Sequence, residues 1–187
     1  MNFRIIGQAI IMSIFLFVWA DCLAGTPPKD PSVFGIKFGY YGNGDIVIDN
    51  FDYNPDDDVW GGIYLDYPIH KKLYLGAAVD IIQFEYWDDK YYILDISLVT
   101  KFRIKTNDPD LFLHPAVGVG YAWAQDIPNY GESDYLTFQF FMEMLYKLTA
   151  KQGLVIDMGY LWGPNGGNDR HDITFGPMFI FRGGLAF

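Results

Sequence analysis

The chain has 187 residues, of which 51% are hydrophobic and 19% aromatic, and its formal net charge is −10 at pH 7. This length suits a single domain. The acidic balance excludes nucleic acid as a favoured partner, because an acidic surface repels the phosphate backbone. Cys22 is the only cysteine, so no intrachain disulfide can form. It lies where a lipoprotein signal places its lipidated cysteine, but Asp21 before it departs from that motif.

The amino terminus carries the only continuous apolar run of the chain, from Ile5 to Trp19. The run follows a basic residue and ends near small residues, which is typical of a signal peptide, and it is short for a bilayer-spanning helix. We expect a signal peptide over residues 1–24, cleaved after Ala24 or Gly25, and a Pro-rich lead over residues 25–32. An uncleaved anchor helix is the alternative interpretation.

After this lead, the sequence is a succession of period-2 segments separated by turn residues, without a helical period. Most segments reach or exceed the 9–11 residues that a tilted transmembrane strand needs. We expect eight strands, over Val33–Tyr41, Val59–Tyr67, Leu73–Tyr86, Tyr91–Ile104, Leu111–Ala124, Asp134–Leu148, Leu154–Gly163 and His171–Phe187. The predicted fold is therefore all-β, an eight-stranded antiparallel up-and-down transmembrane β-barrel over residues 33–187.

The two faces of these strands differ in residue size. In the last strand one parity is bulky and apolar, comprising Phe175, Phe179, Phe181, Leu185 and Phe187. Small residues crowd the polar parity of several strands, including Gly76, Ala78, Gly118, Gly120 and Gly184. The interior of an eight-stranded barrel is only just wide enough for side chains. Residue size therefore favours a membrane barrel over a soluble barrel, which has the same alternation with its apolar face inward.

The connections also differ in length. Pro68–Lys72 and Thr149–Gly153 are short, whereas Gly42–Asp58 is long and acidic. Short turns on one side and longer loops on the other are typical of outer-membrane barrels. We expect the acidic segment to be a solvated loop, since it lacks the ligand spacing of a calcium loop. The sequence accordingly predicts no metal site and no cofactor.

Three segments, Leu73–Ala77, Pro115–Trp123 and Phe179–Phe187, resemble the small outer-membrane β-barrel superfamily, typified by the OmpA membrane domain and by OmpX- and OmpW-type proteins. The resemblance covers nearly the whole mature chain. It implies the outer membrane of a Gram-negative bacterium, with outer-membrane lipid as the surrounding partner. A terminal aromatic residue such as Phe187 resembles the strand end that the barrel-assembly machinery reads. We expect a monomer.

The lumen-facing parity carries ten charged or titratable residues, which we predict to form a polar network: Lys37, Asp66, Asp80, Asp95, Lys101, Arg103, His114, Glu143, Asp157 and Arg182. Pairing the hairpins by their turns places Lys101 opposite His114, and His114 opposite Glu143. Buried charges need partners, so a network that fills the lumen is the simpler interpretation. A proton or ion relay through the barrel is the alternative.

These patterns lead us to expect a non-enzymatic outer-membrane protein with an envelope-structural, surface-interaction or minor small-solute passage role, and no catalytic residues. One alternative is a lipid A-modifying enzyme, because His171, flanked by Asp169 and Asp172, begins the last strand and Ser133 precedes the sixth. The ordered motifs of lipid-modifying barrels, such as His-x-Ser-Asn-Gly, are not visible. A soluble secreted β-barrel that binds a small apolar ligand is the other alternative.

Overall fold

A computed structural model describes residues 32–42, 44–49, 51–53, 58–86, 89–127 and 131–187. The expected signal peptide over residues 1–24, its cleavage site, Cys22 and the lead up to residue 31 lie outside the described residues. Within the described part, no helix is long and apolar enough to cross a bilayer.

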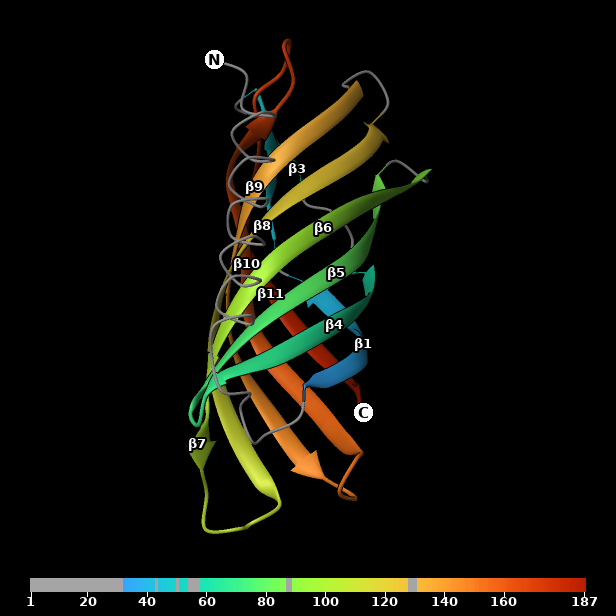
Figure 1. Ribbon diagram of the computed structural model, residues 1–187. Helices are drawn as coiled ribbons and strands as arrows, with labels where there is room; N and C mark the ends of the chain where they lie inside the picture. Colours follow the sequence, from blue (N-terminus) through green and yellow to red (C-terminus); the bar gives the residue numbers. More distant parts are fainter. Residues whose placement is uncertain (1–31, 43, 50, 54–57, 87–88, 128–130) are drawn as a thin grey trace.

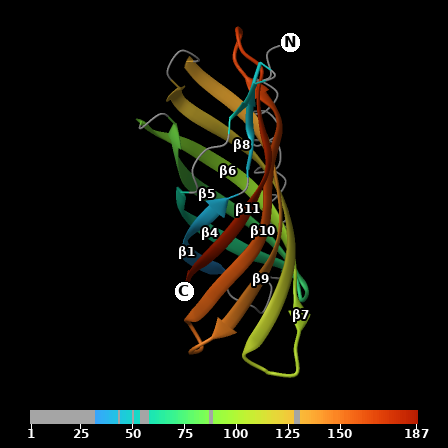
Figure 2. The ribbon, with the colours of Figure 1, turned by 180° about the vertical axis from the view of Figure 1, so that it is seen from behind.

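Eight long antiparallel strands wrap into one barrel (Figures 1 and 2). They are β1 (Val33–Gly42), β4 (Asp58–His70), β5 (Leu73–Tyr86), β6 (Asp89–Phe102), β8 (Leu111–Ile127), β9 (Gly131–Lys147), β10 (Gly153–Gly167) and β11 (Ile173–Ala186). Each pairs with the next, and β1 pairs with β11 from Gly35 opposite Ala186 to Gly42 opposite Phe179, which closes the sheet. The predicted eight-stranded barrel is confirmed, with strand bounds that differ from the predicted ones by a few residues.

Three short strands extend this barrel. β2 (Ile46–Ile48) and β3 (Phe51–Tyr53) form a hairpin within the acidic segment, and β2 pairs with β11 through Ile48 opposite Ile173. The prediction of a solvated loop was wrong for this part, because Ile46 and Ile48 bury their side chains in the apolar cluster inside the barrel. β7 (Ile104–Lys105) continues the pairing of β6 along β8.

The outer face of the barrel is apolar and its inner face holds the charges. Phe38 and Phe140 are 66% and 65% exposed, whereas Asp95 and Asp157 are fully buried. A soluble barrel shows the reverse arrangement, with its apolar face turned inward. The face assignment from residue size is thus confirmed for these strands, and the soluble alternative is contradicted.

The predicted face of Phe175 is wrong. This side chain is 4% exposed and packs inside the barrel against Tyr135, with ring centroids 4.4 Å apart. The pairing of β10 with β11 shifts between Gly163 opposite Phe175 and Leu161 opposite Met178, which leaves one extra residue on β11. Such a β-bulge reverses the parity of the strand, so that Phe175 lies inside while residues beyond the bulge keep the predicted faces.

The interior is layered along the barrel axis. We call the end where β1 begins and β11 finishes the terminal end, and the opposite end the loop end. Toward the loop end the lumen is filled by a large apolar cluster that includes Tyr41, Ile46, Ile48, Trp60, Ile82, Tyr91, Tyr135, Leu161, Ile173, Phe175 and Ile180. A smaller cluster extends toward the terminal end, comprising Tyr64, Phe112, Leu145, Val155 and Ala186. Between them lies a layer of charged side chains.

Candidate functional site in the barrel lumen

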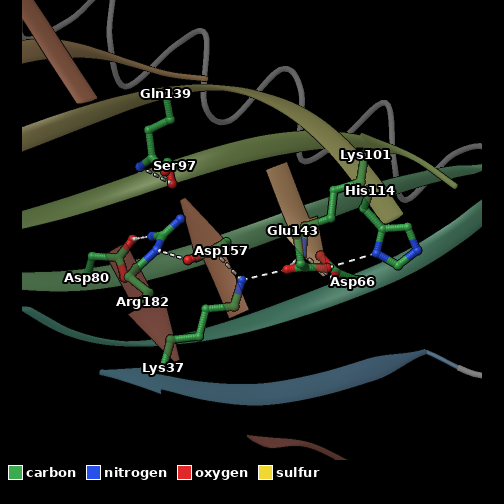
Figure 3. Close-up of polar contacts among 10 residues, drawn as sticks. All are labelled: Lys37, Asp66, Asp80, Ser97, Lys101, His114, Gln139, Glu143, Asp157 and Arg182. Carbon is green, nitrogen blue, oxygen red and sulfur yellow. Dashed lines mark hydrogen bonds and ion pairs between the residues drawn. The ribbon is translucent and has the colours of Figure 1, made fainter. Parts of the chain in front are cut away.

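Each of the eight long strands contributes one member to a connected set of polar side chains in the middle of the lumen (Figure 3). In strand order from β1 to β11 the members are Lys37, Asp66, Asp80, Lys101, His114, Glu143, Asp157 and Arg182. All are at most 5% exposed. We call this set the luminal chain. It unites eight of the ten predicted network residues.

Glu143 is the branch point of the luminal chain. Its Oε2 accepts hydrogen bonds from the Nζ atoms of Lys37 and Lys101, each at 2.6 Å. Its Oε1 lies 2.9 Å from Nδ1 of His114, which stands directly opposite it in the β8–β9 register, as predicted. One carboxylate therefore joins three strands in addition to its own.

From Glu143 the luminal chain runs in two directions. Lys101 also donates to Asp66 at 2.7 Å, which ends the shorter arm. Lys37 donates to Asp157 at 2.8 Å, and Asp157 accepts a second hydrogen bond from Nε of Arg182, also at 2.8 Å. Nη1 of Arg182 lies 3.6 Å from Asp80, which ends the longer arm.

The charges alternate in sign along the luminal chain, in the order Asp66, Lys101, Glu143, Lys37, Asp157, Arg182, Asp80. Removing a charge from water costs several kcal/mol unless a partner compensates it. In this order every carboxylate has a cation beside it and every cation has two carboxylates. Each buried charge of the luminal chain thus has a partner of opposite sign that compensates for its removal from water.

Aromatic rings support the three cations from the side. The ring centroid of Tyr64 lies 4.3 Å from Nζ of Lys37 and 4.6 Å from Nζ of Lys101. The guanidinium of Arg182 lies 4.3 Å from the Trp60 ring. The ring faces attract cations, most strongly where water is excluded. Tyr64 is not among the ten predicted network residues, although it shares the inner parity of Asp66 on β4.

Asp95, also predicted in the network, is held separately by neutral partners. Its carboxylate accepts hydrogen bonds from Thr137 at 2.7 Å and from Gln139 at 2.9 Å, and Gln139 lies 3.3 Å from Ser97. These three partners share the inner parity, which is the signal that could have identified them. Asp95 stands opposite Asp80 in the β5–β6 register.

Two details of the predicted network are corrected. Lys101 stands opposite Ala116 rather than His114, because the pairing continues through β7 to Lys105 opposite Phe112. Arg103 lies toward the terminal end, half-buried, with its guanidinium 4.5 Å from the Tyr74 ring and 5.0 Å from the Phe112 ring.

The space that remains in this layer is small. A cavity of about 20 Å³ is lined by Lys37, Tyr64, Asp66, Arg182 and their neighbours. A water molecule needs roughly 10–15 Å³ of such space. Asp66 Oδ1 is buried without a protein hydrogen-bond partner. The cavity therefore suits a single water molecule at this carboxylate and is too small for a solute.

His171, Asp172 and Ser133, which were considered for a lipid A-modifying enzyme, lie toward the loop end and outside the luminal chain. His171 Nδ1 lies 2.5 Å from Oδ2 of Asp49, and the backbone N–H of Asp172 donates to Oδ1 of Asp49 at 3.0 Å. The hydrogen bond from His171 holds the pKa of Asp49 below its usual value, and the bond from Asp172 adds to this effect. Ser133 is 1% exposed on β9, so its hydroxyl is not presented to a substrate at the surface.

The described residues offer no candidate site for a metal ion. Over the described ranges, no group of three or more His, Cys, Asp or Glu side chains could hold a metal ion. The close contacts of the luminal carboxylates are with lysine and arginine nitrogens and, for Glu143, also with the imidazole of His114. The arrangement balances charge across the lumen, because its contacts join strands that are not neighbours in the sheet.

No family model matches the chain, and no curated protein matches it. Solved structures do. Neisserial surface protein A is 12% identical, with 84% of this chain and 98% of that chain covered and a TM-score of 0.57. The outer membrane protein OprG from Pseudomonas aeruginosa is 12% identical, with 83% and 96% covered and a TM-score of 0.53. At these identities the likeness concerns the fold: the chain has the fold of the small outer-membrane β-barrels, as the sequence resemblance predicted.

Proposed function

We propose that the protein is a non-enzymatic β-barrel of the outer membrane with a sealed lumen, which acts as an envelope-structural element and through the surfaces at its two ends. The luminal chain carries this proposal. Eight side chains, one from each wall strand, meet across the axis of the barrel at hydrogen-bond or ion-pair distance. A barrel built for passage would leave its axis open.

The apolar outer face supports the membrane placement. Large side chains such as Phe38, Val59 and Phe140 are more than half exposed around the barrel wall. Monomeric soluble proteins rarely leave an apolar surface of this extent uncovered, whereas lipid chains cover it in a bilayer. Outer-membrane lipid is accordingly the proposed partner along the wall, with the protein as a monomer.

The final strand supports a further part of the proposal, contact with the barrel-assembly machinery. Phe187 follows β11 at the seam of the barrel, where its N–H donates to the carbonyl oxygen of Phe34 at 2.7 Å and its own carbonyl oxygen accepts from the N–H of Phe34 at 3.1 Å. The side chain remains 47% exposed. The exposed ring at the end of the strand that pairs with β1 is the feature that the machinery would contact.

Three features of the lumen argue against the passage of small solutes. The luminal chain crosses the middle, the cavity beside it is about 20 Å³, and the large apolar cluster fills the lumen toward the loop end. An ion that crossed this cluster would lose its hydration without gaining polar partners, at a cost of several kcal/mol or more. The structure thus favours the structural and surface roles over minor solute passage.

The test is single-channel recording with the purified barrel in a planar bilayer, alongside a general porin that reports the sensitivity of the bilayer. Heat-modifiable migration on a detergent gel verifies that the same preparation is folded. We expect a folded barrel without conductance steps. Stable open steps from the folded protein would refute the sealed lumen.

A second measurement addresses the enzymatic alternative. Lipid A is extracted from outer membranes with and without the protein and compared by mass spectrometry. We expect identical acyl compositions, because Ser133, the candidate nucleophile, is buried. A gain or loss of an acyl chain that depends on the protein would replace this proposal with a lipid-modifying enzyme.

A further inference from the structure

We propose that the terminal end of the barrel binds the anionic headgroups of phospholipids. The binding surface, which we call the basic rim, consists of the cations in and beside the three strand connections at this end: Lys71, Lys72, Arg103, Lys105, Lys147 and Lys151. The inference rests on the membrane placement proposed above and adds to it a preferred class of lipid. Figure 1 shows the turn beside β7 and the β9–β10 turn at the bottom of the barrel, together with the C-terminus.

The two ends of the barrel differ in the sign of their charge. Residues 70–72, 103–110 and 147–152 carry the six cations of the basic rim and two carboxylates, Asp108 and Asp110. Oδ1 of Asp108 accepts the N–H of Asp110 within their own turn. At the loop end acidic residues predominate over cations: the described residues between 42 and 58 include four aspartates, Asp45, Asp49, Asp52 and Asp58, and no lysine or arginine. An anionic surface is therefore attracted to the terminal end and repelled from the loop end.

The cations of the basic rim stand at the edge of the apolar outer face. Tyr146 and Leu148, 43% and 51% exposed, flank Lys147, and Phe102, 46% exposed, precedes Arg103. Lipid-facing residues next to a cation place that cation at the boundary of the bilayer, where long basic side chains extend to the headgroups. The basic rim is thus at the depth of the lipid phosphates.

Two of these cations converge on one ring. The guanidinium of Arg103 lies 5.0 Å from the centroid of Phe112, and Nζ of Lys147 lies 4.9 Å from the same centroid. Arg103 precedes β7 and Lys147 ends β9, so the fold brings cations from two different strand connections to the same ring. A cation near an anionic membrane surface contributes about 1 kcal/mol of attraction, which is about a fivefold change in affinity. Phosphate oxygens are the complementary ligand for such a cluster.

The test uses the full barrel in phosphatidylcholine bilayers that contain a trace of spin-labelled phosphatidylglycerol or spin-labelled phosphatidylethanolamine. The motionally restricted component of the electron spin resonance spectrum gives the relative association constant of each lipid with the barrel. We expect phosphatidylglycerol to associate at least about twofold more strongly when averaged over all lipid sites, since only those beside the basic rim select by charge. High salt should abolish the preference.

Substitutions assign the preference to the basic rim. The variant with Lys71, Lys72, Lys105 and Lys151 changed to Gln keeps only Arg103 and Lys147 of the basic rim and should lose most of the preference. Lys90→Gln, at an exposed lysine of the loop end, should retain it. If the fourfold variant does not fold, the Lys71→Gln/Lys72→Gln variant of the exposed β4–β5 turn should show a partial loss. Equal association of both lipids, or a preference that survives these substitutions, would overturn the inference. A barrel that restricts neither lipid would instead refute the membrane placement.

Discussion

Replacing Glu143 with Gln is the most direct perturbation of the luminal chain. Glu143 accepts hydrogen bonds from Lys37 and Lys101 at 2.6 Å each and pairs with His114 at 2.9 Å, in a position that is 2% exposed. Glutamine has nearly the same size and keeps one acceptor oxygen, but it carries no charge. Each lysine would then retain a single carboxylate, Asp157 for Lys37 and Asp66 for Lys101.

The expected loss is large for a substitution of this size. Removing one partner of a buried ion pair costs about 3–5 kcal/mol. The retained oxygen of Gln still accepts one hydrogen bond, worth about 1 kcal/mol. We therefore expect Glu143→Gln to lower the free energy of unfolding by about 3 kcal/mol, near the bottom of the range for a broken buried pair.

The assay is reversible urea unfolding of the barrel in lipid vesicles, followed by tryptophan fluorescence. Glu132→Gln is the matched control, because Glu132 lies on the same strand with its side chain exposed, where a lost charge should change stability by less than about 0.5 kcal/mol. If both variants lost less than about 1 kcal/mol, the ion pairs of Glu143 would not stabilise the barrel and the reasoning would fail.

Three further predictions use the same unfolding assay or hydrogen exchange. Asp95→Asn should cost no more than about 1.5 kcal/mol, because Asp95 is held by hydrogen bonds from neutral side chains; a loss equal to that of Glu143→Gln would contradict this. Phe140→Arg, at mid-strand, should cost about 2–4 kcal/mol and Tyr146→Arg, near the terminal end, about 0–1, and equal losses would argue against a bilayer around this wall. The pKa of Asp49 is lowered in the folded protein, so the hydrogen bonds of its carboxylate stabilise the fold above the unfolded pKa of this group. This stabilisation is lost as the pH falls through the folded pKa. Protection of the Asp172 amide, which donates to Asp49, should therefore fall below about pH 4 in the wild type and be low at neutral pH in Asp49→Gly, which lacks the acceptor oxygen; full protection in that variant would refute the role of this hydrogen bond.

The strands and their faces could be predicted from the sequence because lipid and lumen place opposite demands on alternate residues. Gly62 and Gly76 illustrate the demand of the lumen. A Cβ atom at Gly62 would overlap the carboxylate of Asp80, and one at Gly76 would overlap that of Asp66. Small residues on the polar parity therefore indicate where the larger luminal side chains need space, which a sequence shows directly.

Register and parity changes could not be predicted in the same way. Lys101 pairs with Ala116 because β7 extends the hairpin to Lys105, and Phe175 turns inward because β11 holds an extra residue before Met178. Each shift depends on how two strands fit together, and neither leaves a mark on the period of a single strand. The connections of the luminal chain, such as Lys37 to Glu143, cross the lumen between strands that are not neighbours, so they follow only from the closed barrel.

These cross-lumen contacts give the luminal chain a consequence for closure. Asp157 stands directly opposite Glu143 in the β9–β10 register, and like charges in such positions destabilise a sheet. Arg182 on β11 reaches Asp157, but Lys37, which contacts both carboxylates, belongs to β1 at the other edge of the open sheet. Lys37 can reach them only when β1 and β11 have paired. The charges that span the lumen therefore also favour the closed barrel over the open sheet, since only closure brings Lys37 into contact with both Asp157 and Glu143.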